Sequence, residues 1–313
     1  MLERILSIAL SLTVLAAPLP GLDAPPASPA PPVEAQTEMT IRKTVGEVRL
    51  GFHLSSRNGS PVNGVQKNQF AVSQDGRPVS TLTGFYADDN LPLRLVLMID
   101  ASASMSKGFE AEREAAAAFL RRVVRPEIDQ SAVVAFSTHA ALDLGTDASS
   151  PETIRRIAML RSAGLTALFD AISDAATRVP AYDRQPVVTR RVLVLLSDGD
   201  DTYSRHSLDD AIAAAQSADL VIYAVTAHNP KDVHWGDANL EKLTQSTGGR
   251  VFFLKKYEQS EKIFADIERE IRSQYTVTFR PTGSRCGFHT VRVEPADRTL
   301  RVRARAGFYG DCS

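Results

Sequence analysis

Three oxygen-bearing side chains in one short stretch define the chemistry that this sequence could perform. Asp100 directly follows the apolar run LVLMI (residues 95–99), and Ser102 and Ser104 follow at alternate positions. A run without polar alternation is typical of a central strand of a parallel sheet, which is buried on both faces. A carboxylate and two hydroxyls in a tight loop can surround one point, and such oxygen ligands suit a hard divalent cation. The stretch therefore predicts a Mg²⁺-type site at a strand's carboxyl end, where open α/β sheets form ligand crevices.

Two later segments place residues of the same kind in similar positions. Thr166 begins a helical pattern in GLTALFDAI (residues 164–172), and Asp198 ends a second apolar strand in RVLVLLSD (residues 191–198). Asp-x-Ser-x-Ser alone is also ordinary in loops and at helix N-caps, so the first stretch by itself is a weak signal. The three segments together, in this order, strengthen the prediction of a metal site.

With these segments the chain resembles the von Willebrand factor type A family and its metal-ion-dependent adhesion site. The resemblance implies that the hydroxyls bind the cation directly and that the two carboxylates act directly or through water. The implied cation is Mg²⁺, or Mn²⁺ or Ca²⁺, and in adhesive members a partner's Asp or Glu completes the coordination. The implied ligands are Asp100, Ser102, Ser104, Thr166 and Asp198.

A wider resemblance covers nearly everything after a proline-rich segment. The segments NGSPVNGVQKNQFAVSQDGRPV, STGGR and RAGFY look like those of exported bacterial proteins built around a domain related to von Willebrand type A. Two positions depart from that pattern, because Ala103 and Leu165 stand where relatives commonly carry glycine. If either backbone required positive φ, the substitution would cost about 1 kcal/mol or more.

Other polar residues near these segments have two interpretations each. Asp200 and Asp201 extend the acidic loop and either tune the field at the cation or are solvated loop residues. His228 and His234 share one loop, but they lack a thiol or third histidine at zinc spacing, which favours surface residues. Trp235 is either a surface contact or a cover on the sheet edge.

The chain has 313 residues, 43% of them hydrophobic, with a net charge of −1. This length allows at least one full core, and the charge, without a basic patch, gives no reason to expect a nucleic-acid partner. Residues 1–24 contain Arg4 and a mainly apolar run ending in small residues, which predicts a secretory signal peptide. An uncleaved N-terminal anchor is the alternative. Residues 25–39 include a proline-rich stretch that predicts a stiff, extended linker.

The remaining chain divides by its hydrophobic periodicity. Residues 91–273 alternate strands and helices, which predicts an α/β fold with a doubly wound parallel sheet. Residues 40–90 and 274–313 have period-two patterns and turn dipeptides such as Asn63-Gly64 and Asp75-Gly76. We expect these flanking β segments to pair in one β-sandwich with the α/β domain inserted between them, although two separate small domains are the alternative.

The chain has two cysteines, Cys286 and Cys312, both in the C-terminal segment. In an exported protein a disulfide between them is the default expectation, although two free thiols are also consistent with the sequence. In the chain-entropy model such a link stabilises by roughly 3 to 4 kcal/mol.

These features predict a non-catalytic, periplasmic or extracellular protein-binding module that uses a divalent cation. One alternative is an envelope scaffold in which the cation only pins loops together. Another is a serine acyl-transferase, since Ser104 and Lys107 match Ser-x-x-Lys, but the third motif of that family, Lys-Thr-Gly, is absent.

Overall fold

The computed structural model describes residues 46–87, 90–138, 142–145, 147, 150–179, 188–227, 234–254, 259–283 and 286–310. The segments predicted as signal peptide and linker, together with His228 and Cys312, lie outside these residues. Within them, no helix combines the length and apolar character needed to cross a bilayer.

The central domain is built on a six-stranded sheet in the order β10-β9-β8-β5-β6-β7. Five strands are parallel, and β7 pairs antiparallel with β6 as a hairpin. The strands are β5 (Leu93–Asp100), β6 (Gln130–Phe136), β7 (Leu142–Gly145), β8 (Arg190–Leu196), β9 (Leu220–Thr226) and β10 (Val251–Phe253). Every residue of the central strand β5 is buried, as its unbroken apolar run predicts.

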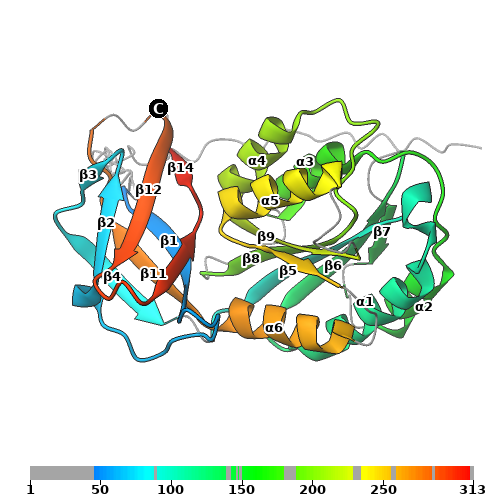
Figure 1. The fold of residues 1–313 in the computed structure, drawn as a ribbon, viewed down its shortest axis with the longest axis horizontal. Coiled ribbons are helices and arrows are strands. Elements are labelled where there is room, and N and C mark those ends of the chain that lie inside the picture. Colours follow the sequence, from blue (N-terminus) through cyan, green and yellow to red (C-terminus); the bar gives the residue numbers. More distant parts are fainter. Residues whose placement is uncertain are drawn as a thin grey trace, which may run out of the picture. The chain divides into compact units, whose positions relative to one another are not determined.

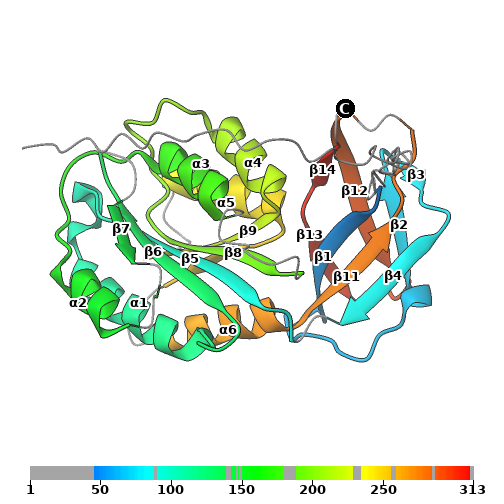
Figure 2. The same cartoon turned by 180° about the vertical axis from the view of Figure 1, so that it is seen from behind.

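Helices cover both faces of this sheet (Figures 1 and 2). One apolar core joins the first face to α1 and α6, with Ile157 of α2 at its edge. A second core joins the other face to α3, α4 and α5. The helices are α1 (Phe109–Val123), α2 (Pro151–Met159), α3 (Leu168–Arg178), α4 (Leu208–Ser217), α5 (Trp235–Thr247) and α6 (Ser260–Arg272). The predicted doubly wound α/β fold is confirmed.

Strands from both ends of the chain combine in two four-stranded antiparallel sheets. Their orders are β13-β1-β11-β4 and β14-β12-β2-β3, so each sheet contains strands from before and after the α/β domain. Phe52, Phe70, Phe85 and Tyr275 pack their rings together in the shared core. The strands are β1 (Val48–Ser55), β2 (Phe70–Gln74), β3 (Arg77–Pro78), β4 (Leu82–Ala87), β11 (Gln274–Phe279), β12 (Gly287–Pro295), β13 (Arg301–Ala304) and β14 (Gly307–Gly310).

The register of the last strands bears on the cysteines. Gly287 of β12 pairs with Gly310 of β14, and Cys286 immediately precedes Gly287. Cys312 lies outside the described residues, so the Cys286–Cys312 disulfide remains a prediction.

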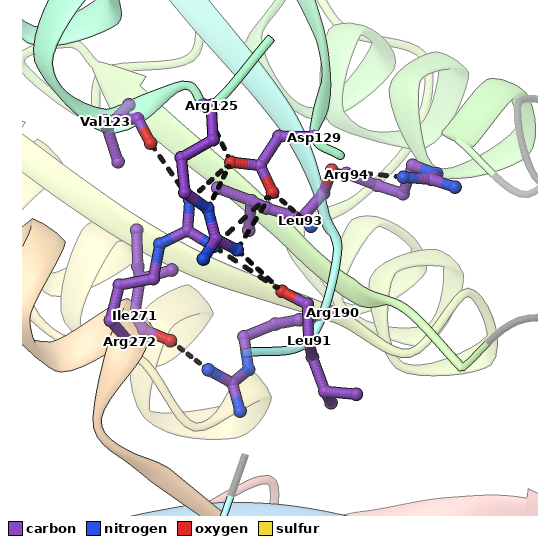
Figure 3. A network of polar contacts seen from close by, with 9 residues as sticks. All are labelled: Leu91, Leu93, Arg94, Val123, Arg125, Asp129, Arg190, Ile271 and Arg272. Carbon is purple, nitrogen blue, oxygen red and sulfur yellow. Dashed lines mark hydrogen bonds and ion pairs between the residues drawn. The ribbon is translucent and has the colours of Figure 1, made fainter. Parts of the chain in front are cut away.

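A buried carboxylate closes the junction where the chain passes into and out of the α/β domain (Figure 3). Asp129 accepts hydrogen bonds from the Leu93 backbone N–H at 2.9 Å and from the Arg272 guanidinium at 2.5 Å. Arg125 donates to the same carboxylate from its backbone and its side chain, at 2.9 and 3.2 Å. Because Leu93 begins β5 and Arg272 ends α6, Asp129 joins the two crossing segments.

Arginine donors also reach backbone carbonyls around this junction. Arg272 donates to the Val123 carbonyl at 2.9 Å, and Arg125 donates to the Leu91 carbonyl at 3.2 Å. Burial acts to raise the pKa of Asp129, but donation from Arg272 and Arg125 outweighs it and leaves that pKa below its usual value.

Candidate metal centre

The five predicted ligands lie at or just beyond the carboxyl ends of β5 and β8 and before α3. Asp100 is the last residue of β5, and Ser102 and Ser104 lie in the turn that contains η2 (Ala103–Ser106). Thr166 lies two residues before α3, and Asp198 lies two residues after β8 ends. Four of these residues are buried, whereas Ser104 is exposed. The Ser102 and Ser104 hydroxyl oxygens are 3.0 Å apart.

Backbone hydrogen bonds join the loop after β5 to the loop before α3. The Ala103 N–H donates to the Gly164 carbonyl at 3.0 Å, and the Ala163 N–H donates to the Ala101 carbonyl at 2.8 Å. This two-way pairing places the Ser102–Ser104 turn beside the segment that leads to Thr166.

The loop after β8 is joined to the same segment. The backbone N–H groups of Thr202 and Tyr203 both donate to the Thr166 carbonyl at 2.9 Å. The Thr202 hydroxyl in turn accepts from the Thr166 N–H at 3.0 Å. The three loops that carry the predicted ligands are therefore directly connected to one another.

Asp100 is a fully buried carboxylate held by neutral donors. One oxygen accepts from the Ser102 N–H at 2.9 Å, and the other accepts from the Ser197 hydroxyl at 2.7 Å. Burial raises the pKa of Asp100 to about 6, and the nearby charge of Asp198 acts in the same direction. The hydrogen bonds from Ser102 and Ser197 act to lower this pKa. Two acids thus face a region of low solvation.

The donor set fits a hard cation. Among the described residues, no Lys or Arg forms an ion pair with Asp100 or Asp198. Buried acids without a basic partner are costly, and a bound divalent cation would neutralise them. The same part of the chain contains no cluster of three or more His, Cys, Asp or Glu side chains suited to a metal. A cation here would therefore depend on hydroxyl ligands beside the two carboxylates.

The loop that carries Asp198 approaches α5 so closely that two glycines are required. Gly199 has φ of +81°, and a Cβ added there would lie 2.3 Å from the Gly236 carbonyl oxygen. A Cβ added to Gly236 would lie 2.1 Å from the Asp198 carbonyl oxygen. The first turn of α5 is thereby fixed against the Asp198 loop, and the Asn239 amide donates to the Gly199 carbonyl at 3.0 Å.

The two departures from the family pattern do not strain the site. Among the described residues that are not glycine, only Asp75 and Asp219 have positive φ, so Ala103 and Leu165 do not. The left-handed position in the second loop is instead Gly164, with φ of +85°. The free-energy cost that a positive φ at Ala103 or Leu165 would carry therefore does not arise.

Asp201 has a structural role near the site. Its carboxylate accepts from the Phe169 N–H at 3.1 Å and from the Ser204 hydroxyl at 2.6 Å, which satisfies a free donor at the start of α3. Asp200 donates its backbone N–H to the Asp198 carboxylate at 3.1 Å. These contacts position the loops, and a role of the Asp200 and Asp201 carboxylates in tuning the field at the cation stays a prediction.

Sequence reasoning missed three residues that organise the site. Ser197 and Thr202 are positioning hydroxyls, because they bond the Asp100 carboxylate and the Thr166 backbone. The third is Glu112 on α1, which is only 7% exposed and has one carboxylate oxygen without a hydrogen-bond partner. A polar residue in an alanine-rich helix gives no sequence signal that it points inward.

Glu112 is a buried acid near the two predicted acidic ligands. It lines a small cavity whose other walls are mostly apolar, including Leu196, Val225 and Phe264. Burial raises the pKa of Glu112 to about 8, and the charges of Asp100 and Asp198 act in the same direction. Glu112 is therefore mainly protonated at neutral pH in the metal-free protein.

We expect Glu112→Gln to stabilise the metal-free protein increasingly as the pH rises from 5 to 8. In wild type the folded state holds the Glu112 proton more tightly than the unfolded state does. Its contribution to the free energy of unfolding is therefore fully present below the unfolded pKa of 4.5 and is lost as the pH rises through about 8. The gain over wild type should reach about 2 to 4 kcal/mol at pH 8. Urea unfolding in EDTA at several pH values measures it.

The control for this experiment is Glu114→Gln, an exposed position on the same helix. Asp100 titrates in the same direction in all three proteins, so the difference between them isolates Glu112. Parallel pH profiles for wild type and Glu112→Gln would contradict the expectation.

The chain belongs to the von Willebrand factor type A domain family, which it matches over residues 95–266. Domains of this family bind a divalent metal at a metal-ion-dependent adhesion site and commonly mediate protein–protein contacts. No curated protein matches the chain at a significant level.

Several solved structures are similar to this chain. Proximal thread matrix protein 1 from the mussel byssus, with a zinc-occupied MIDAS motif, shares 19% identity at a TM-score of 0.48, over 64% of this chain and 50% of that protein. A von Willebrand factor type A protein from Catenulispora acidiphila shares 13% identity at a TM-score of 0.48, over 82% and 71%. BatB from Bacteroides thetaiotaomicron shares 14% identity at a TM-score of 0.46, over 58% and 100%. This chain spans only half the length of the mussel protein.

Proposed function

We propose that this protein is an exported, non-catalytic binding module that holds a partner protein through a divalent cation. One observation carries the proposal: two buried acids, which pair with no Lys or Arg of the described residues, lie on hydrogen-bonded loops that also carry three hydroxyl side chains. This donor set is all oxygen, which favours Mg²⁺, with Mn²⁺ or Ca²⁺ as substitutes.

Each residue of the set has a role in the proposal. Ser102, Ser104 and Thr166 hold the cation through their hydroxyls, and Asp100 and Asp198 supply negative charge directly or through water. The three hydroxyls add no charge, and carboxylates that act through water neutralise the ion less completely than direct ligands would, because their charges lie farther from it. When bound, the cation therefore supplies a positive site that an Asp or Glu carboxylate of the partner can complete.

The N-terminal sequence supports export. The apolar run after Arg4 and its small-residue end fit a cleaved signal peptide, which supports a location in the periplasm or outside the cell. Contact with a membrane would then require that this segment remain uncleaved. The expected Cys286–Cys312 disulfide agrees with an oxidising compartment.

Affinity capture with the full chain from cell-envelope extract tests the proposal. We expect wild type to retain a partner in Mg²⁺ and to release it in EDTA, because the cation forms the contact. Ser102→Ala should capture none, since it removes a proposed direct ligand while the residue's backbone N–H can still donate to Asp100. Mass spectrometry of the eluates gives the measurement.

Ser106→Ala is the matched control, because Ser106 is an exposed hydroxyl in the same turn. It should behave as wild type. Capture that persists in EDTA with the protein still folded would instead favour the scaffold alternative, in which the cation only pins the loops.

A further inference from the structure

Three large apolar side chains are exposed near the candidate metal centre, two on its loops and one at the start of α5. Leu165 is 50% exposed, Tyr203 is 52% exposed and Trp235 is 91% exposed. Single exposed apolar residues are ordinary on protein surfaces, but a group of them around one site is typical of an interaction surface.

Leu165 and Tyr203 are connected through Thr166. Leu165 directly precedes Thr166, and the Tyr203 N–H donates to the Thr166 carbonyl at 2.9 Å. The Leu165 backbone is itself fixed, because its N–H donates to the Thr138 hydroxyl at 2.8 Å. Both side chains are therefore carried on backbone that is anchored at the third hydroxyl ligand.

Trp235 is connected to Asp198. It is the first residue of α5 and precedes Gly236, whose backbone packs directly on the Asp198–Asp200 loop. Leu240 and Leu243 of the same helix are fully buried in the core, whereas the indole remains almost entirely in solvent. The Trp235 side chain therefore contributes almost nothing to the packing of the core.

We propose that Leu165, Tyr203 and Trp235 form an apolar rim around the metal centre. The occupant is a protein segment in which one Asp or Glu is flanked by large apolar side chains. This inference rests on the proposed function, because the acid completes the cation while its neighbours bury the rim. The positive charge of the bound cation favours an acidic residue in the partner. Trp and Tyr are residue types that commonly dominate binding energy at interfaces.

A selection from phage-displayed random dodecapeptides on the full-length protein in Mg²⁺ tests the rim. We expect the selected peptides to share an acid with an aromatic or aliphatic residue within two positions. A synthetic tryptophan-free peptide from this set should bind Leu165→Ser, Tyr203→Ser and Trp235→Ser each about tenfold more weakly than wild type. Trp235 is the only tryptophan in the chain, so a blue shift of its emission reports its burial directly.

Tyr86→Ser is the matched control, since Tyr86 on β4 is 51% exposed and belongs to the sandwich. It should bind the peptide as wild type does. Mn²⁺ affinity, measured by calorimetry, should be the same in all variants because none removes a ligand.

The two proposals fail in different ways. If wild type does not bind Mn²⁺, the proposed function fails. If Mn²⁺ binds but the rim variants hold the peptide as tightly as wild type, the rim is wrong and the metal site stands. Peptides that share an acid without apolar neighbours, or a selection without any metal-dependent binder, would also overturn the rim.

Discussion

Asp100→Asn is expected to lower the affinity for Mg²⁺ or Mn²⁺ by at least about a hundredfold. Asp100 supplies one of the two negative charges at the centre, and a charge–charge interaction at contact distance in a partly desolvated site is worth about 4 kcal/mol. The amide keeps the shape of the carboxylate but carries no charge. Isothermal titration of the full chain with MnCl₂ measures the effect.

The same substitution should leave the metal-free fold intact. Burial raises the pKa of Asp100 to about 6, so at pH 8 the folded protein holds an ionised acid at a cost that Asn removes. We expect equal or higher stability in EDTA, which separates lost ligation from lost folding. Asp209→Asn, at an exposed position on α4, is the control and should bind Mn²⁺ normally. Unchanged Mn²⁺ affinity in Asp100→Asn would remove this carboxylate from the site.

Asp129→Ala is expected to destabilise the protein by about 3 to 5 kcal/mol. The substitution leaves the Leu93 N–H without its acceptor and removes the counter-charge of Arg272, whose side chain is only 19% exposed. Removing one partner of a buried ion pair costs this much because the other charge remains desolvated. The midpoint of urea unfolding in EDTA measures the change.

A surface ion pair provides the comparison. Glu152 contacts Arg155 and Arg156, and all three side chains are more than half exposed. Glu152→Ala should therefore cost less than about 1 kcal/mol. Because Asp129 contacts the amino-terminal end of β5, Mn²⁺ affinity of the folded Asp129→Ala protein should match wild type. A loss no larger than that of Glu152→Ala would show that the junction does not depend on this carboxylate.

Hydrophobic periodicity predicted the α/β architecture because each element here has a strong pattern. The unbroken apolar run of β5 indicated a central strand, and the spacing of Leu168, Ala171, Ile172 and Ala175 indicated the buried face of α3. Helix α2 was missed because it is short and buries only Thr153 and Ile157. Its signal was the Ser150-Pro151 start, where Ser150 caps the helix and Pro151 occupies its first turn.

The sequence predicted the edge of the sheet where the candidate site lies, because strand ends can be recognised from hydrophobic pattern. Asp100 and Asp198 end or follow apolar strands of one parallel sheet, so a common edge followed from topology alone. The interloop hydrogen bonds did not follow, because Ser197 and Thr202 look like ordinary loop hydroxyls. Asp129 and Glu112 show the same limit: both are buried acids, yet Asp129 pairs with Arg272, which is distant in sequence, and Glu112 has an oxygen without a hydrogen-bond partner. Only tertiary structure distinguishes them.

The sandwich contains both the first and the last strand of the described chain, β1 and β14. The α/β domain is inserted between β4 and β11, where Asp129 joins the two crossing segments, and Arg303 and Arg305 also form ion pairs with Glu270 and Asp219 of that domain. Tension applied at β1 and β14 would therefore act first on the pairing of β1 with β11 and β13 and of β14 with β12. The α/β domain would carry little of that load, so the hydrogen bonds that connect its three loops would be kept.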